Sequence, residues 1–200
     1  MSETEIDGNI TVAGTADDVT IDGLTVQDGA SVGGDLAGVY LAAGATGTEI
    51  TNTIFTRDGD VDGDSSRGIL TTYNGGNTGV TVSQNSFSGW ATGTYVNPGS
   101  EGIEITDNDF DGNYVGLSVD GPDGAVVTGN SFTDNALEGM GVGPGQEISG
   151  FANLSGNDFS GNPTHVGVYT DAIDVDAQTG NTFTGGIVTI SGSDSVYASI

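Results

Sequence analysis

The stretch Ile103-Glu-Ile-Thr-Asp-Asn108-Asp-Phe110 joins a short run of alternating apolar residues to an Asn-x-Phe triplet. The same arrangement occurs in Val80-Thr-Val-Ser-Gln-Asn85-Ser-Phe87 and Ala125-Val-Val-Thr-Gly-Asn130-Ser-Phe132. Further copies are Asn157-Asp-Phe159 and Asn181-Thr-Phe183, with degenerate earlier ones at Asn52-Thr-Ile54 and Asp22-Gly-Leu24. A pattern that returns in this way indicates a chain built from internal repeats.

The apolar residue that ends each copy is the anchor of its repeat. The anchors are Leu24, Ile54, Phe87, Phe110, Phe132, Phe159 and Phe183, separated by 22 to 33 residues. A unit of this length cannot bury its own apolar face, but stacked units can bury it against their neighbours. We therefore expect each short strand to pair with its equivalent in the next unit, about 4.8 Å away.

A glycine followed by a second short alternating run comes after each anchor. These glycines are Gly38, Gly68, Gly93, Gly116, Gly139, Gly167 and Gly186. Turn-forming Gly, Asn, Asp and Ser bound the runs, and no window carries the apolar stripe of a helix. The pattern therefore predicts an all-β fold.

The Asn-x-Phe pairs followed by Gly-apolar-x-apolar resemble the repeats of right-handed parallel β-helix proteins of the pectate-lyase-like type. This resemblance covers about residues 19–190. It implies a single-stranded right-handed parallel β-helix solenoid of about seven coils, with apolar residues stacked inside. It also implies an asparagine ladder at a tight turn, formed by Asn52, Asn85, Asn108, Asn130, Asn157 and Asn181.

We expect one domain, because no linker or composition shift divides the chain. Residues 1–18 would form an N-terminal cap with a leading strand at Ile10–Val12. Residues 19–190 would form the β-helix, and residues 191–200 a C-terminal cap with a strand at Val196–Ile200.

The charge of the chain excludes several classes of function. The chain has 28 acidic residues, two arginines and no lysine, which gives a formal charge of −26. Nucleic-acid and anionic-lipid binding need clusters of basic residues, and the chain has none. It has no cysteine, no apolar run long enough for membrane insertion and no N-terminal signal peptide pattern. Carboxylates stacked near 5 Å from coil to coil would need screening by molar salt or by calcium. The composition resembles that of extreme halophiles and predicts a high-salt setting, with a calcium-loaded marine or secreted protein as the alternative.

A calcium site is the first candidate site. Asp58, Asp60, Asp62 and Asp64 alternate, with Gly63 in the sixth place, as in the first half of a calcium-binding loop. The twelfth place holds Ile69 where such a loop has a bidentate Glu. The segment is therefore either a solvated acidic loop or a cation site, with calcium as the cation and no other cofactor expected.

Two clusters are candidates for catalysis if the protein is an enzyme. Asp107, Asp109 and Asp111 alternate around Phe110, which places them outside the coil. The resemblance implies that a pair of such carboxylates could cut a polysaccharide, but any acidic coil would show the same alternation. His165 and Tyr169, beside Asp171, could abstract a sugar proton, although a lone histidine at a strand edge is more often simply exposed or hydrogen-bonded.

Six aromatic residues are candidates for glycan binding. They are Tyr40, Tyr73, Trp90, Tyr95, Tyr114 and Tyr169. Gathered on one exposed face they would form a sugar-binding strip, and otherwise they fill the core.

We expect a non-enzymatic structural or adhesive surface β-helix. Enzymes that resemble this fold bind polyuronate with several basic residues, whereas this chain has only Arg57 and Arg67, which flank the acidic loop. The expected setting is a virion part such as a capsid decoration, turret, spike or tail fibre of a halophilic host, or another extracellular surface. Expected partners are other protein chains, in a homo-oligomer such as a trimer, and a surface glycan. The alternative is a polysaccharide lyase, hydrolase, epimerase or carbohydrate-binding module.

Overall fold

The computed structural model describes residues 4–59, 61, 64–121, 123–143, 151–169, 174–175, 180–185, 187–190 and 197–198. Within these ranges the regular structure is β-strand, with no α-helix, which confirms the all-β prediction. Accordingly, the described residues contain no helix long and apolar enough to cross a membrane.

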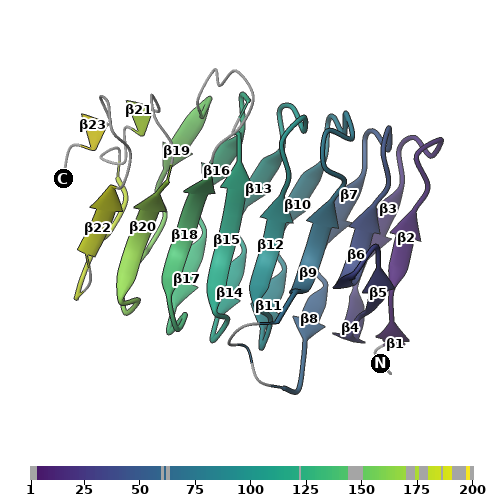
Figure 1. Cartoon of the computed structure of the whole chain (residues 1–200), viewed down its shortest axis with the longest axis horizontal. Coiled ribbons are helices and arrows are strands. Elements are labelled where there is room, and N and C mark those ends of the chain that lie inside the picture. The colour runs from purple at the N-terminus through teal and green to yellow at the C-terminus, as the bar shows by residue number, and fades with distance from the viewer. Residues whose placement is uncertain are drawn as a thin grey trace.

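Three long parallel sheets contain most of the strands (Figure 1). The first sheet holds β1 (Thr4–Gly8), β4 (Leu24–Asp28), β8 (Ile54–Thr56), β11 (Ser86–Ser88), β14 (Asp109–Asp111) and β17 (Ser131–Thr133). The second sheet holds β3 (Thr20–Asp22), β7 (Glu49–Thr51), β10 (Thr81–Ser83), β13 (Glu104–Thr106), β16 (Val126–Thr128) and β19 (Asn153–Ser155).

The third sheet, here called the front sheet, faces the viewer in Figure 1. It holds β2 (Ile10–Val12), β6 (Asp35–Leu41), β9 (Ser66–Thr71), β12 (Thr92–Val96), β15 (Val115–Asp120), β18 (Glu138–Gly143), β20 (Thr164–Val168) and β22 (Ile187–Ile190). The short strand β5 (Ala30–Val32) pairs antiparallel with β6. A separate two-stranded sheet joins β21 (Asp174–Val175) to β23 (Tyr197–Ala198).

The chain visits the three sheets in turn, so each coil stacks on the one before it (Figure 1). The first and second sheets have six strands each, which gives about six turns rather than the expected seven. The difference arises because the last repeats do not add a seventh strand to these two sheets within the described ranges. The expected leading strand at Ile10–Val12 is β2, which pairs with β6.

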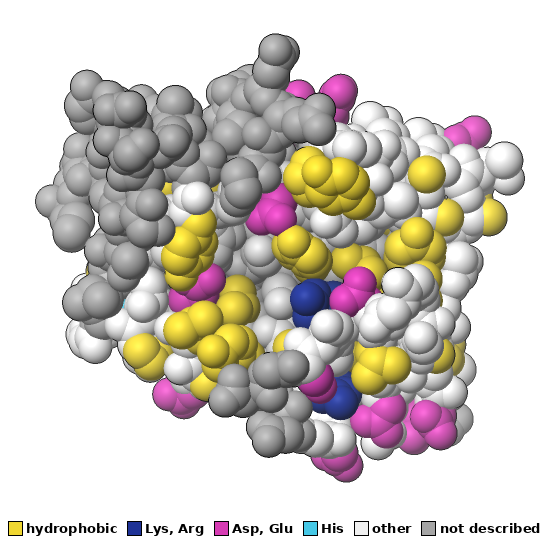
Figure 2. Space-filling view, viewed as in Figure 1, with side chains coloured by type: hydrophobic (Ala, Val, Ile, Leu, Met, Phe, Trp, Pro, Cys, Tyr) yellow, Lys and Arg dark blue, Asp and Glu magenta, His cyan; other side chains and the backbone are white. Residues whose placement is uncertain are grey.

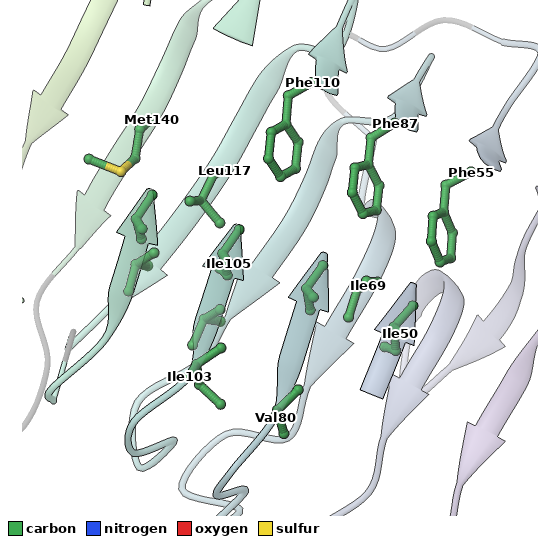
Figure 3. Packing of buried hydrophobic residues seen from close by; sticks show 14 of the residues in the cluster. Ile50, Phe55, Ile69, Val80, Phe87, Ile103, Ile105, Phe110, Leu117 and Met140 are labelled. Carbon is green, nitrogen blue, oxygen red and sulfur yellow. The ribbon is translucent and has the colours of Figure 1, made fainter. Parts of the chain in front are cut away.

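A column of stacked phenyl rings fills the interior (Figure 3). Phe55, Phe87, Phe110, Phe132, Phe159 and Phe183 stack with centroids 4.7 to 5.4 Å apart and ring planes within 9°. The spacing equals that of neighbouring strands, so the backbone ladder itself places one ring on the next. Aliphatic side chains such as Ile105 and Leu117 surround the rings and are fully buried.

The two earliest anchors predicted from the sequence are wrong. Phe55, not Ile54, pairs with Phe87, and Ile54 is 41% exposed. Val26, not Leu24, pairs with Phe55. The register shifts because Asn52 itself takes the left-handed turn (φ 49°), which leaves Thr53 at the ladder position and Ile54 pointing outward.

The asparagine ladder exists; four of its members are buried, and the last one, Asn181, is half-buried. Asn85, Asn108, Asn130, Asn157 and Asn181 form it, each side-chain amide donating to the next side-chain carbonyl at 3.0 Å. The residue before each ladder asparagine adopts the left-handed conformation, as Gln84 and Asp107 do with φ of 57° and 56°. Asn52 lies outside the ladder and donates to Asp22 instead. A second ladder of Asn113, Asn135 and Asn162 was not predicted.

Glycines at the start of the front strands leave room for the phenyl column. A Cβ at Gly93 would lie 2.6 Å from the Gly116 carbonyl oxygen and 2.8 Å from the Phe110 ring. Gly68, Gly116 and Gly139 occupy equivalent places, and His165 takes this place in β20. Gly167, which the sequence pattern aligned with this row, pairs instead with Gly141.

Outside the coil, carboxylates alternate with hydroxyl side chains. Along the second sheet the order is Glu49, Thr81, Glu104, so the two glutamates are separated by one coil. Such carboxylates lie about 10 Å apart, which is twice the spacing expected from the sequence. Direct neighbours do occur at the bridge between Glu101 and Asp123.

Candidate functional site

The outward face of the front sheet, here called the front face, differs from an evenly acidic surface (Figure 2). Both cationic side chains are visible on this side of the molecule, and hydrophobic side chains lie beside them. Tyr40, Leu70 and Tyr95 occupy one register row on β6, β9 and β12, so their side chains share this face. Outward aromatic residues on neighbouring strands can form a binding surface.

A tyrosine cleft of about 270 Å³ is the first feature of the front face. It is lined by Val32, Gly33, Asp35, Tyr40, Leu70, Thr71, Thr72, Tyr73, Tyr95 and Asn97. Val32 and Gly33 come from the hairpin in which β5 pairs antiparallel with the first residues of β6. The cleft thus combines three aromatic rings with a few polar groups, the usual composition of a small-ligand site.

Neighbouring side chains fix two of the three rings. The Thr72 and Tyr40 hydroxyls are 2.7 Å apart. The Tyr95 hydroxyl donates to Asp120 Oδ2 at 2.6 Å, and the Arg67 guanidinium lies 5.2 Å from the centre of the Tyr95 ring. Tyr73 is 63% exposed and forms the open side of the cleft.

A glycine trough continues the front face toward the C-terminal coils. Gly141 and Gly143 on β18 and Gly167 on β20 have no side chains, and carboxylates lie over them. A Cβ at Gly141 would lie 2.5 Å from Glu138 Oε1, and one at Gly143 would overlap the Asp120 carboxylate. These two glycines are two residues apart, about 7 Å along the strand, so the Asp120 and Glu138 carboxylates occupy neighbouring places in the trough.

Each trough carboxylate accepts a hydrogen bond from a tyrosine. Glu138 accepts from Tyr169 at 2.7 Å, and Asp120 accepts from Tyr95. Burial raises the pKa of both carboxyl groups, and the tyrosine hydrogen bonds only partly offset it. Burial together with Glu138 raises the pKa of Tyr169 to about 12, so this phenol stays protonated as a donor.

Asp107 and Asp109, two of the expected catalytic carboxylates, line a separate polar groove. This open groove of about 710 Å³ follows the turn between the first and second sheets, with Asn52, Gln84 and Ser131 also in its wall. Asp109 and Asp111 point outward and Phe110 inward, as the alternation predicted. Burial and the nearby Asp111 raise the pKa of Asp109. A catalytic role for these three residues stays a prediction.

His165 and Tyr169 do not form a shared site. His165 is 2% exposed and packs against Phe183 at 5.6 Å between ring centres. Burial lowers the pKa of its imidazole. Tyr169 lies on the surface against Glu138, and Asp171 is outside the described residues. Of the two alternatives to catalysis expected for His165, exposure or a hydrogen bond, the structure shows the second: the side chain is buried, continues the inward glycine row and is hydrogen-bonded to the backbone of Thr184.

The expected calcium loop is only partly described. Asp60 and Asp62 lie outside the described residues. Asp64 pairs with Arg57 at 2.6 Å and accepts from Ser66, and these contacts outweigh burial and lower its pKa. The described part of the chain brings together no three acidic, histidine or cysteine side chains that could hold a metal ion. Calcium binding by Asp58, Asp60, Asp62 and Asp64 stays a prediction.

The sequence reasoning missed Asp35, Asp120 and Glu138. The available signal was the run Gly139-Met-Gly141-Val-Gly143, since alternate glycines in a strand mark a place where another group approaches closely. Of the six aromatic candidates, Trp90 is fully buried in the core, whereas Tyr40, Tyr73 and Tyr95 meet in one cleft.

Comparison with known families agrees with this architecture. The family model for a right-handed β-helix region matches residues 8–197. The chain belongs to the right-handed β-helix family. The predicted right-handed parallel β-helix is thereby confirmed, although its coil count is lower. No curated protein matches this chain.

Proposed function

We propose that this protein is a non-enzymatic, adhesive surface β-helix that binds a glycan chain along its front face. The tyrosine cleft is the observation that carries the proposal. Tyr40, Tyr73 and Tyr95 offer rings against which sugar rings can pack, and Asp35 and Asn97 offer hydrogen-bonding groups beside them. The trough extends the same face over three further strands, which suits an extended polymer.

The setting that we propose is a multi-chain assembly on a virion or cell surface in high salt. Support comes from the charge of −26, which keeps such a surface soluble in salt. The outer edges of β1, β2 and β3 also have no partner strand among the described residues. Another copy of the chain could pair with them, and homo-oligomers are the usual outcome of such edges.

Replacement of the exposed ring of the cleft tests the proposal. In molar KCl the protein should bind members of a glycan array, and Tyr73→Ala should weaken that binding at least about tenfold, since it removes one stacking surface. Ile54→Ala is the control, because Ile54 is an exposed apolar residue in the wall of the polar groove and outside the front face, and it should bind as the wild type does. Absence of any bound glycan, or equal loss in both variants, would contradict the proposal. Light scattering should give a mass above 19.9 kDa.

A second candidate function, glycoside hydrolysis, is favoured by the Asp120 and Glu138 pair. Two neighbouring carboxyl groups can act as general acid and general base with a water molecule between them. A raised pKa is what an acid needs to stay protonated near neutral pH, and Glu138, at 4% exposed, is the more buried.

Product analysis separates the two candidates. Under our main proposal, wild-type protein incubated with neutral polysaccharides, pectate or alginate releases neither reducing ends nor unsaturated sugars. Release of reducing ends with a bell-shaped pH profile, lost at least about 100-fold in both Asp120→Asn and Glu138→Gln, would replace it with the hydrolase. Glu104→Gln serves as the control, because it removes an exposed carboxylate from the second sheet and leaves the trough intact.

A further inference from the structure

The polar lining of the tyrosine cleft indicates which class of glycan fits. Asp35 begins β6 opposite Val32 of the hairpin, and its half-buried carboxylate lies at the cleft. It is close enough to the Tyr95 phenol to help raise the pKa of that group. Asp120, which accepts the hydrogen bond of the Tyr95 hydroxyl, is a second carboxylate near the same ring.

The single cation near the cleft, Arg67, is not one of the residues that line it. Arg67 lies over the Tyr95 ring, and its Nη1 donates to the Ser66 carbonyl at 2.9 Å. The other arginine, Arg57, pairs with Asp64. The described groups that line the cleft therefore supply carboxylate, amide and hydroxyl groups but no cationic side chain that could receive an anion.

The volume of the cleft suits one sugar ring. About 270 Å³ is below the range of sites for drug-sized molecules, so a single ring fits while the rest of a chain continues along the face. A ring packed against Tyr40 and Tyr95 would bring its hydroxyl groups to Asp35. An ionised carboxylate accepts such hydrogen bonds well, because it has acceptor sites on both oxygens.

We propose that the tyrosine cleft binds one uncharged pyranose ring of a neutral glycan, and that Asp35 sets this specificity by accepting ring hydroxyls and repelling uronates. This inference rests on the proposed function and names the ligand class of the same cleft. A uronate at this place would put its carboxylate beside Asp35 in a partly dehydrated cleft, where like charges are poorly screened.

Matched oligosaccharides provide the test. Titration calorimetry in molar KCl compares trisaccharides of β-1,4-mannose, α-1,4-galactose and β-1,4-glucose with their uronate counterparts, which differ at C6. High salt screens the long-range field of the −26 chain, so the remaining discrimination is local. Wild-type protein should bind at least one neutral member at least about tenfold more tightly than its uronate.

Asp35→Asn keeps the size of the side chain and removes its charge. We expect its neutral-to-uronate affinity ratio to fall to about threefold or less, with an unchanged melting temperature. Glu104→Gln, which also removes one negative charge, from the exposed side of β13, should keep the wild-type ratio.

The outcomes separate the inference from the function on which it rests. Equal or tighter uronate binding by the wild type, or an unchanged ratio in Asp35→Asn, overturns the inference, while Tyr73-dependent glycan binding would leave the proposed function standing. Absence of binding by every trisaccharide, together with an empty glycan array, overturns both.

Discussion

Replacing Phe110 with alanine should lower the free energy of unfolding by about 3–5 kcal/mol. The Phe110 ring is fully buried and stacks on Phe87 at 4.8 Å and on Phe132 at 4.9 Å. Its removal leaves a cavity in the middle of the column, which neighbouring coils cannot close because their strands hold the spacing. Denaturant titration with a two-state fit measures the loss.

The matched control is Ile54→Ala, at a residue that the sequence pattern also marked as an anchor. Ile54 is 41% exposed, so its truncation should cost less than about 1 kcal/mol. If the two variants lose similar stability, the register of the phenyl column is wrong.

Replacing Asn108 with alanine should cost about 2–5 kcal/mol, although the side chain removed is smaller than a phenyl ring. Its Oδ1 accepts from the backbone and the side chain of Asn85 at 3.0 Å each. Its Nδ2 donates to the Val82 carbonyl at 2.8 Å and to Asn130 Oδ1 at 3.0 Å. Alanine leaves these buried groups without partners, and water cannot replace them at a place that is 2% exposed.

Asn52→Gly is the control for the ladder. The Asn52 amide makes one exposed hydrogen bond, to Asp22 at 2.9 Å, and glycine tolerates the left-handed φ of 49° at this turn, so we expect a loss below about 1 kcal/mol. Thermal unfolding of both variants at the same salt concentration checks the difference. A large loss in Asn52→Gly together with a small one in Asn108→Ala would contradict the assignment of the ladder.

The inner side of the fold could be predicted from the sequence because burial leaves a periodic trace. Phe87, Phe110 and Phe132 recur after an asparagine, and each is fully buried in the phenyl column. Errors arose where one residue type suits two positions. Asn52 fills the left-handed turn rather than the ladder, since asparagine tolerates both, and the register of its repeat shifts by one residue.

The front face could not be predicted in the same way. Asp120 was not singled out, although it is 25 residues from Tyr95, about one coil. Because the coils differ in length, residues that are neighbours in space are not separated by a constant number of residues. Outward residues also show no periodic hydrophobic pattern, so the sequence does not indicate which of them are neighbours. The candidates that were chosen by chemical type alone lie apart in the structure. His165 is buried in the core, and Tyr169 donates a hydrogen bond to Glu138 on the surface.

The sequence by itself determined the β-helix, because parallel stacking needs only repeats that place an apolar residue inside at each turn. The tertiary structure decided which outward side chains meet. The cleft of Tyr40, Tyr73 and Tyr95 and the pairing of Glu138 with Tyr169 depend on the register between strands of different coils. Hydrogen bonds and packing inside the coil fix that register. The register then decides which outward residues are neighbours, and these residues show no periodic pattern in the sequence.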